Sequence, residues 1–312
     1  MFKCIFCLLE LEESFKSEEH VVPLALGGSL IIEEVCKECN EHLGAYVDSP
    51  LINNFLMDMK RYTLKLRERK GGVVNPFKLL LGTNEGKKYK WMLDGEKLSK
   101  IYLIPKIHFD AREDGTSHLL VSVDATEPDK AEEIINKFIE REKLKGNQSI
   151  LNRVQRDEII KDAPELEFNL KIDILQYKRG LVKIAYEVMY LINGDDFLKD
   201  KISERIRRFL KLKKISRNDV EELEVRGEIN FLSEQKESVL LKNDHEKVQI
   251  AILPSDGITF CKIKIFDLFY GGFQISTHNY GKGPWDGEVF VFNVLKKTHS
   301  RMPVGYYIDQ NY

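Results

Sequence analysis

The chain has 312 residues, of which 43% are hydrophobic and 31% charged, and its formal net charge is −2. This composition indicates a soluble globular protein that is long enough for one small and one larger core. It excludes the chain-wide basic character of many nucleic-acid binders, so the distribution of charge matters more than its sum. No run approaches the roughly 18 apolar residues of a membrane span, and the N-terminus lacks a signal-like segment, so we expect a cytoplasmic protein.

Four of the five cysteines form two Cys-x-x-Cys pairs, Cys4 with Cys7 and Cys36 with Cys39. A two-residue gap lets both sulfurs of a pair face one ion, and four thiolates complete a tetrahedral zinc site. The 28 residues between the pairs, 8–35, exceed the usual zinc-ribbon spacing, so this insertion must form structure of its own. We predict a structural zinc; ordinary reduced cysteines are the alternative.

The insertion predicts a β-hairpin. Residues 19–23 are typical of a short strand, residues 26–28 of its turn, and residues 30–35 of a return strand that leads into the second cysteine pair. A helix is expected directly after that pair. A hairpin and a helix clamped by zinc bring His20, on the first strand, close to Asn40, at the start of the helix.

Glu19, His20 and Asn40 together suit metal-assisted phosphodiester cleavage. A hard ion such as Mg²⁺ or Mn²⁺ prefers oxygen ligands, and a neutral histidine takes a proton from the attacking water. We predict that Glu19 and Asn40 hold the catalytic ion and that His20 is the base. Neighbours on a regular strand point to opposite faces, so we also expect a bend at this pair. The alternative is a surface carboxylate beside an ordinary strand histidine.

Residues 4–44 resemble an HNH, or ββα-metal, endonuclease module, through the segments CIFC, EHVVPLALGG and VCKECNEHLG. They are most similar to the zinc-braced branch with two Cys-x-x-Cys knuckles, as in the junction-resolving phage recombination endonuclease. The resemblance implies that His20 is the general base and that Glu19 and Asn40 bind the catalytic ion. The structural zinc ligands that it implies are Cys4, Cys7, Cys36 and Cys39.

The segment departs from the HNH pattern at three places. Asn40 stands where a histidine is frequent, which favours Mg²⁺ or Mn²⁺ over a softer catalytic ion. The middle asparagine that orients the base is missing from residues 29–35, and a backbone carbonyl is the expected replacement. Leu43 stands at the place of a helical glutamate of the phage enzyme. The accessory residues that could substitute for it are Glu41, His42 and Asp48.

Two basic runs follow the acidic N-terminal segment. Residues 40–47 predict a short helix, and residues 51–69 a basic helix that ends at Gly71 and Gly72. A second basic run spans residues 199–217. Either run suits a phosphate backbone, and a solvated helix face is the alternative. The residues of the first run assigned to backbone contact are Lys60, Arg61, Lys65, Arg67, Arg69 and Lys70.

The rest of the chain, from residue 73 onward, predicts both strands and helices, and it contains no motif that indicates a particular chemical activity. Residues 73–123 have short β-rich runs with turns at Asp94-Gly95 and Asp114-Gly115. Residues 127–145 have helical apolar spacing, and residues 180–212 predict a helical hairpin around Asn193-Gly194. From about residue 225, the chain returns to β-type alternation.

The predicted fold class is α+β, with a small N-terminal zinc-braced ββα-metal module and a larger mixed C-terminal domain. The expected divisions are 1–50 for the HNH module, 51–72 for a basic linking helix, and 73–312 for a domain that serves substrate positioning, sensing or assembly. That domain is divisible near 164–225.

The predicted function is metal-dependent cleavage of nucleic acid, with DNA as the expected substrate, in a bacterial or phage defence or restriction effector. A non-catalytic zinc module that binds nucleic acid or protein and an RNA-cleaving nuclease are the alternatives. Assembly into a homo-oligomer is left open.

Overall fold

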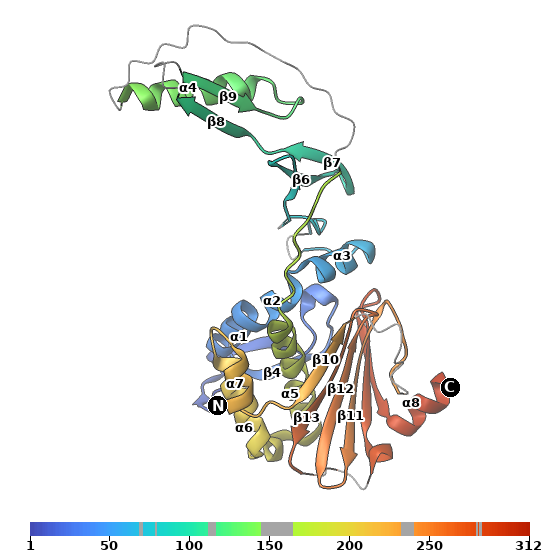
Figure 1. Ribbon diagram of the computed structural model, residues 1–312. Coiled ribbons are helices and arrows are strands. Elements are labelled where there is room, and N and C mark those ends of the chain that lie inside the picture. Colours follow the sequence, from blue (N-terminus) through green and yellow to red (C-terminus); the bar gives the residue numbers. More distant parts are fainter. Residues whose placement is uncertain are drawn as a thin grey trace. The chain divides into compact units, whose positions relative to one another are not determined.

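The computed structural model describes residues 1–68, 71–78, 80–111, 117–144, 165–231, 240–278, 280 and 283–312. The chain divides into two compact units. One is formed by Met1–Val74 together with Ile172–Tyr312, and the other by Asn75–Lys171. Figure 1 follows the chain through both. The N-terminal segment therefore shares a unit with the C-terminal part of the chain.

The N-terminal segment consists of short elements around the four cysteines. Two antiparallel hairpins, β1 with β2 and β3 with β4, are followed directly by helix α1. Gly28, in the loop between β3 and β4, must be glycine because a Cβ there would lie 1.7 Å from the carbonyl oxygen of Val22. The elements are β1 (Phe2–Lys3), β2 (Glu10–Leu11), η1 (Glu13–Phe15), β3 (Lys16–His20), η2 (Leu24–Leu26), β4 (Ile31–Cys36) and α1 (Lys37–Leu43).

A single helical run continues from α1 through the π-helical turn η3 (Gly44–Asp48) into α2 (Ser49–Ile52), because the junction residues keep right-handed helical dihedral angles. Helix α3 (Phe55–Thr63) follows, with the side chain of Asn54 accepting a hydrogen bond from the backbone N–H of Met57. The helix predicted to begin at Asn40 thus begins three residues earlier. The single basic helix predicted over 51–69 is wrong, because the chain breaks at Asn53 and again at Lys65, where φ is +56°.

In the described residues, four α-helices and a six-stranded sheet complete this unit. The sheet is antiparallel throughout, in the order β10-β13-β12-β11-β14-β15. Helix α5 loses helical geometry at Gly194 (φ 55°, ψ −140°), inside the predicted hairpin turn. The elements are α5 (Ile174–Leu198), α6 (Lys201–Lys211), α7 (Arg217–Glu222), β10 (Gly227–Phe231), β11 (Lys247–Ser255), β12 (Ile258–Ile265), β13 (Phe269–Ser276), η4 (Pro284–Asp286), β14 (Glu288–Asn293), β15 (Thr298–Pro303) and α8 (Val304–Asn311).

Helix α5 lies between the N-terminal elements and the sheet (Figure 1). Its middle is buried on all sides, and one continuous apolar core joins the three parts. Val35 and Leu43 enter that core from the N-terminal segment, Tyr186 from α5, and Ile263 and Phe273 from the sheet. Most helices in globular proteins bury one face, and one that is apolar all round lies inside a core. The position of α5 follows from this pattern.

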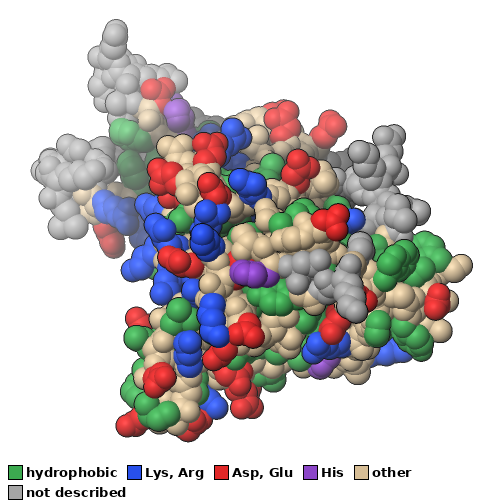
Figure 2. Space-filling view, turned by 90° about the horizontal axis from the view of Figure 1, so that it is seen from below, with side chains coloured by type: hydrophobic (Ala, Val, Ile, Leu, Met, Phe, Trp, Pro, Cys, Tyr) green, Lys and Arg blue, Asp and Glu red, His purple; other side chains and the backbone are tan. Residues whose placement is uncertain are grey.

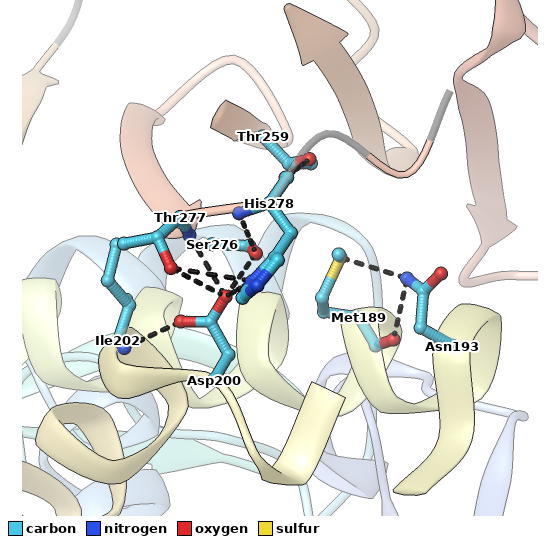
Figure 3. Close-up of polar contacts among 8 residues, drawn as sticks. All are labelled: Met189, Asn193, Asp200, Ile202, Thr259, Ser276, Thr277 and His278. Atoms are coloured by element: carbon cyan, nitrogen blue, oxygen red, sulfur yellow. Dashed lines mark hydrogen bonds and ion pairs between the residues drawn. The ribbon is translucent and has the colours of Figure 1, made fainter. Parts of the chain in front are cut away.

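A buried carboxylate ties the start of α6 to the end of β13 (Figure 3). Asp200 caps α6 by accepting a hydrogen bond from the backbone N–H of Ile202 at 2.7 Å. Its other oxygen accepts hydrogen bonds from the Ser276 hydroxyl, from the Thr277 N–H and hydroxyl, and from Nδ1 of His278 at 2.9 Å. Burial alone would raise the pKa of Asp200, but these hydrogen bonds outweigh it and lower that pKa.

The second unit contains two small sheets and one helix. Strands β5, β6 and β7 form a three-stranded antiparallel sheet, and β8 pairs with β9. Phe138 of α4 packs against Phe109 of β8, with ring centroids 5.3 Å apart. The elements are β5 (Gly82–Asn84), β6 (Lys87–Asp94), β7 (Lys97–Leu103), β8 (Lys106–Ala111), β9 (Ser117–Ser122) and α4 (Asp129–Leu144).

The predicted α+β class is confirmed, as are the strands over 73–123, the helix over 127–145 and the strands of the tail. The predicted turn at Asp114-Gly115 lies outside the described residues. The division of the chain differs from the expected one, because residues 75–171 form the separate unit and residues 1–74 do not. Among the described residues, no helix has the length and apolarity needed to cross a membrane.

Asp200→Asn is expected to lower the free energy of unfolding by about 1.5–3 kcal/mol at pH 7, since hydrogen bonds to a charged group are lost. The folded-state pKa lies below the unfolded value, so this stabilisation is present above pH ~4 and is lost as pH falls through the folded pKa. Urea unfolding at pH 7 and pH 3 measures it, and the gap between variant and wild type should close at the lower pH. Asp196→Asn, which removes an exposed partner of Lys199, is the matched control and should change stability little.

Candidate functional site

The four cysteines of the two predicted pairs converge. The sulfur atoms of Cys4, Cys7, Cys36 and Cys39 all lie within 4.8 Å of one another, and those of Cys7 and Cys36 are 3.9 Å apart. Bonds of about 2.3 Å to a tetrahedral zinc ion put sulfur atoms about 3.8 Å apart. These residues are therefore positioned to bind a metal ion, and an all-thiolate set fits zinc.

The thiols of this cluster are electrostatically coupled. A hydrogen bond from Cys39 lowers the pKa of Cys4 to about 4, and the same bond raises the pKa of Cys39. Burial raises the pKa of Cys7 to about 11. Four thiolates at this spacing repel one another, so a divalent cation that neutralises them would stabilise the cluster.

The predicted acid and base lie at the end of β3. The register between β3 and β4 shifts between Ser17 and Glu19, and the strand ends at His20, so β3 is irregular where we expected a bend. Glu19 is turned inward and is only 3% exposed, whereas His20 is half-buried. Burial, followed by the nearby Lys183 ammonium, lowers the pKa of His20, which favours a neutral imidazole.

Lys183 of α5 reaches Glu19 from within the core. Its ammonium forms an ion pair with Glu19 Oε1 and donates a hydrogen bond to the backbone carbonyl of His20 at 2.9 Å. The same ammonium lies 3.4 Å from the carboxylates of Asp48 and Glu187. Lys183 and Glu187 are fully buried, and burial raises the pKa of Glu187 well above its usual range. Three carboxylates thus surround one buried cation.

Asn40 lies on α1 and is held against the start of β3. Its side-chain nitrogen donates to the hydroxyl of Ser17 at 2.9 Å and to the backbone carbonyl of Glu18 at 2.7 Å. Because the amide nitrogen faces the strand, the amide oxygen is the atom left for a cation. Asn40 is therefore fixed against Ser17 and Glu18 of β3, and its oxygen is the donor type that Mg²⁺ and Mn²⁺ prefer.

Of the three predicted accessory residues, Asp48 alone contacts the Lys183 group. The turn η3 is π-helical, a form that occurs often at functional sites, and it ends at Asp48. Burial raises the pKa of Asp48 to about 6. His42 Nε2 instead donates a hydrogen bond to the carbonyl of Leu210, at 3.1 Å, and Glu41 is exposed.

The first predicted basic run does not form a common surface. Arg61 is 3% exposed and pairs with Asp58 at 3.0 Å, and Lys60 pairs with Asp267 at 2.5 Å. Arg61 is thus a core residue rather than a phosphate contact. Arg69 and Lys70 lie outside the described residues, and the side chains of Lys65 and Arg67 are at least partly exposed.

The second run brings basic side chains to the N-terminal segment. Arg179 of α5, fully buried, donates hydrogen bonds to the carbonyl oxygens of Tyr46, Leu210 and Leu212 and so joins η3 to the end of α6. The Lys213 ammonium lies 5.9 Å from the centre of the Tyr46 ring. Figure 2 shows Lys and Arg side chains gathered on part of the face seen from below. The exposed members of this run are Lys199, Lys201, Arg208, Lys211, Lys213, Lys214 and Arg217.

Two residues of this site were not predicted from the sequence. Arg179 and Lys183 stand four residues apart on α5, with Glu187 four residues further on, so the three share one helix face. That spacing is visible in an otherwise apolar stretch and was a usable signal. Their partners Tyr46, Glu19 and Asp48, however, are more than a hundred residues away in the chain, and only the folded structure reveals them.

Residues 4–48 thus define a four-cysteine site that suits a metal ion, within a ββα arrangement of β3, β4 and α1 that also carries His20, Glu19 and Asn40. Residues 4–56 match the family described as HNH endonuclease. A search of curated proteins and a search of solved structures each found no match. The match supports a nuclease-type module whose substrates are nucleic acids, and the narrower resemblance to the phage recombination enzyme stays a prediction.

Purified protein is expected to contain about one zinc per chain, and Cys36→Ser to lose it, because three thiolates hold zinc more weakly than four. Chelation should unfold the module rather than merely inhibit it. Elemental analysis and far-UV circular dichroism measure both effects. Cys261→Ala, at a buried position in β12, is the matched control and should keep its zinc. A zinc-free wild type that remains folded would contradict the prediction.

Proposed function

We propose that this protein is a metal-dependent HNH endonuclease that hydrolyses phosphodiester bonds, with DNA as its substrate. The observation that carries the proposal is that the segment matched to the HNH family contains both a convergent four-cysteine site and, beside it, a His20 ring with oxygen donors on neighbouring elements. The sequence alone suggested this combination through a short segment, and the fold supplies a physical basis for it.

In the proposed reaction, His20 takes a proton from the attacking water. Glu19 and Asn40 would hold a Mg²⁺ or Mn²⁺ ion, which supplies charge stabilisation at the scissile phosphate when bound. The carboxylate and amide oxygens are suitable donors for such an ion, and Asp48 Oδ1, buried without a hydrogen-bond partner, is a further oxygen 3.4 Å from the Lys183 ammonium. The cysteine site serves as a frame, since it keeps α1 beside β3.

One observation favours a second candidate, a zinc module that binds nucleic acid or protein without cleaving it. Glu19 is buried and paired with Lys183, so its carboxylate already has a cationic partner. In that case Mn²⁺ would not bind in a manner that depends on Glu19 and Asn40. Calorimetry with Mn²⁺ on wild type, Glu19→Gln and Asn40→Ala separates the two candidates.

The proposed context is a bacterial or phage defence or restriction effector. Residues 75–171, as the separate unit, would position substrate or sense a signal. Support for this context comes from the resemblance alone. An RNA substrate is the alternative that the cleavage assay tests directly.

The exposed lysines at the end of α6 are proposed to contact the phosphate backbone. The N-terminal segment is acidic, so it needs basic surface from another part of the chain to hold nucleic acid. Arg179 and His42 attach this end of α6 to the module, which places Lys211 and Lys213 next to it. Lys65 and Arg67 remain proposed contacts, whereas buried Arg61 does not.

His20→Ala is expected to reduce cleavage by about a hundredfold or more, because the water loses its general base. The assay uses plasmid DNA, single-stranded DNA and RNA with Mg²⁺ or Mn²⁺. His245→Ala, at an exposed position in the same unit, is the matched control and should cleave like wild type. The proposal fails if all three substrates stay intact, or if His20→Ala cleaves as fast as wild type.

The double variant Lys211→Glu/Lys213→Glu is expected to weaken DNA binding about tenfold or more and to reduce the slope of log K against log salt by about 2 units, one for each lost phosphate contact. Binding is measured by fluorescence anisotropy at several salt concentrations, in the His20→Ala background. Lys296→Glu/Lys297→Glu, in the exposed turn between β14 and β15, is the charge-matched control. Equal weakening by both pairs would exclude a specific basic surface.

A further inference from the structure

We propose that Lys183 is a positioning residue of the nuclease site. From α5, outside the matched segment 4–56, it fixes the side chain of Glu19 and the backbone of His20. This inference rests on the proposed function, because Lys183 acts through the ion ligand and the base named there. It makes α5 a part of the catalytic apparatus.

The contacts of Lys183 fix the positions of two neighbouring residues of the proposed site, the side chain of Glu19 and the backbone of His20. Adjacent residues of a strand point to opposite faces, so fixing one side chain inward and the intervening backbone sets the direction of the next. The Lys183 ammonium contacts both, since it pairs with Glu19 Oε1 and donates a hydrogen bond to the backbone carbonyl of His20 at 2.9 Å. Glu19 is thus held inward, and the backbone from which the half-buried His20 side chain extends is fixed as well.

Stability alone does not explain a lysine at this position. Lys183 is fully buried, and its neighbours on α5 include Leu181, Val182 and Ile184, which are also fully buried. Replacing a buried ion pair by apolar residues of similar volume is often neutral or stabilising. Stability therefore gives no reason to keep an ammonium at this buried position. Its contacts converge on the residues of the proposed site, which gives it a second role there.

The acidic side chains around Lys183 outnumber its single positive charge, so they can attract a second cation. Glu19, Asp48 and Glu187 approach this one ammonium, and among the described residues no other Lys or Arg is recorded in an ion pair with them. Asp48 Oδ1 and both oxygens of Glu187 are buried without a hydrogen-bond partner. Without Glu187, whose pKa burial raises well above its usual range, two acidic side chains still face one ammonium, so Lys183 orients Glu19 without cancelling the attraction for a divalent ion.

The test is a double-mutant cycle on the zinc-loaded full chain, with Lys183→Met, Glu19→Gln and their combination. Mn²⁺ affinity is measured by calorimetry without nucleic acid, and melting temperature is measured without added Mn²⁺. We expect Lys183→Met to lower Mn²⁺ affinity about tenfold or more while zinc content is unchanged. The combination should bind Mn²⁺ no more weakly than Glu19→Gln alone, because Lys183 acts through Glu19.

The combination should also melt at a higher temperature than Lys183→Met, since Glu19→Gln removes the unpaired buried carboxylate. If Lys183→Met does not fold, the comparison of Glu19→Gln with the combination still decides the question. Lys178→Met is the matched control on α5. Lys178 donates to the backbone carbonyls of Val225 and Gly227, so its loss should leave Mn²⁺ affinity at the wild-type level.

Two results would overturn the inference: Mn²⁺ affinity of Lys183→Met equal to or above that of wild type, or losses that add in the combination. A wild type that neither binds Mn²⁺ nor cleaves would overturn the proposed function instead. In that event the melting temperatures decide on Lys183 by themselves. If Lys183→Met and Glu19→Gln lower the melting temperature independently, and the two decreases add in the combination, then Lys183 does not hold Glu19.

Discussion

The N-terminal module depends on helix α5 for one of its two supports. A segment of about fifty residues buries too little apolar surface to be stable alone. The cysteine site supports one side, and α5 covers the other. The fit against α5 is close, because a Cβ on Gly180 would lie 2.8 Å from Leu51 Cδ2. The module is therefore integrated into the first unit and is not an independent domain on a linker.

Charged side chains of α5 add electrostatic contacts to this packing. Arg179, Lys183 and Glu187 repeat every four residues along the face of α5. Arg179 donates hydrogen bonds to the carbonyl of Tyr46 within η3 and to the carbonyls of Leu210 and Leu212 at the end of α6, where helix geometry leaves carbonyls without partners. Lys183 satisfies Glu19 and the end of β3. The same helix thus holds both the basic end of α6 and the acidic residue of the proposed site.

The residues that the proposed function needs come from distant parts of the chain. The module supplies the histidine and the oxygen donors, α5 orients them, and α6 contributes positive charge beside an acidic segment. Substitutions at Lys183 and at the exposed lysines of α6 should therefore affect the site, although these residues lie outside residues 4–56. The separate unit, residues 75–171, contributes none of the residues assigned to the proposed site.

The sequence by itself determined the cysteine site and the α+β class, because each depends on local spacing and alternation. It also determined the hairpin, except that the first strand spans Lys16–His20 and not the predicted 19–23. It also indicated Glu19, His20 and Asn40 as a group. Only the tertiary structure decided that Arg61 is buried, that the module shares a core with residues 172–312, and that Glu19 faces Lys183. These features depend on contacts between residues far apart in the chain. Local patterns carry no information about such pairing, and burial then decides which charges are exposed.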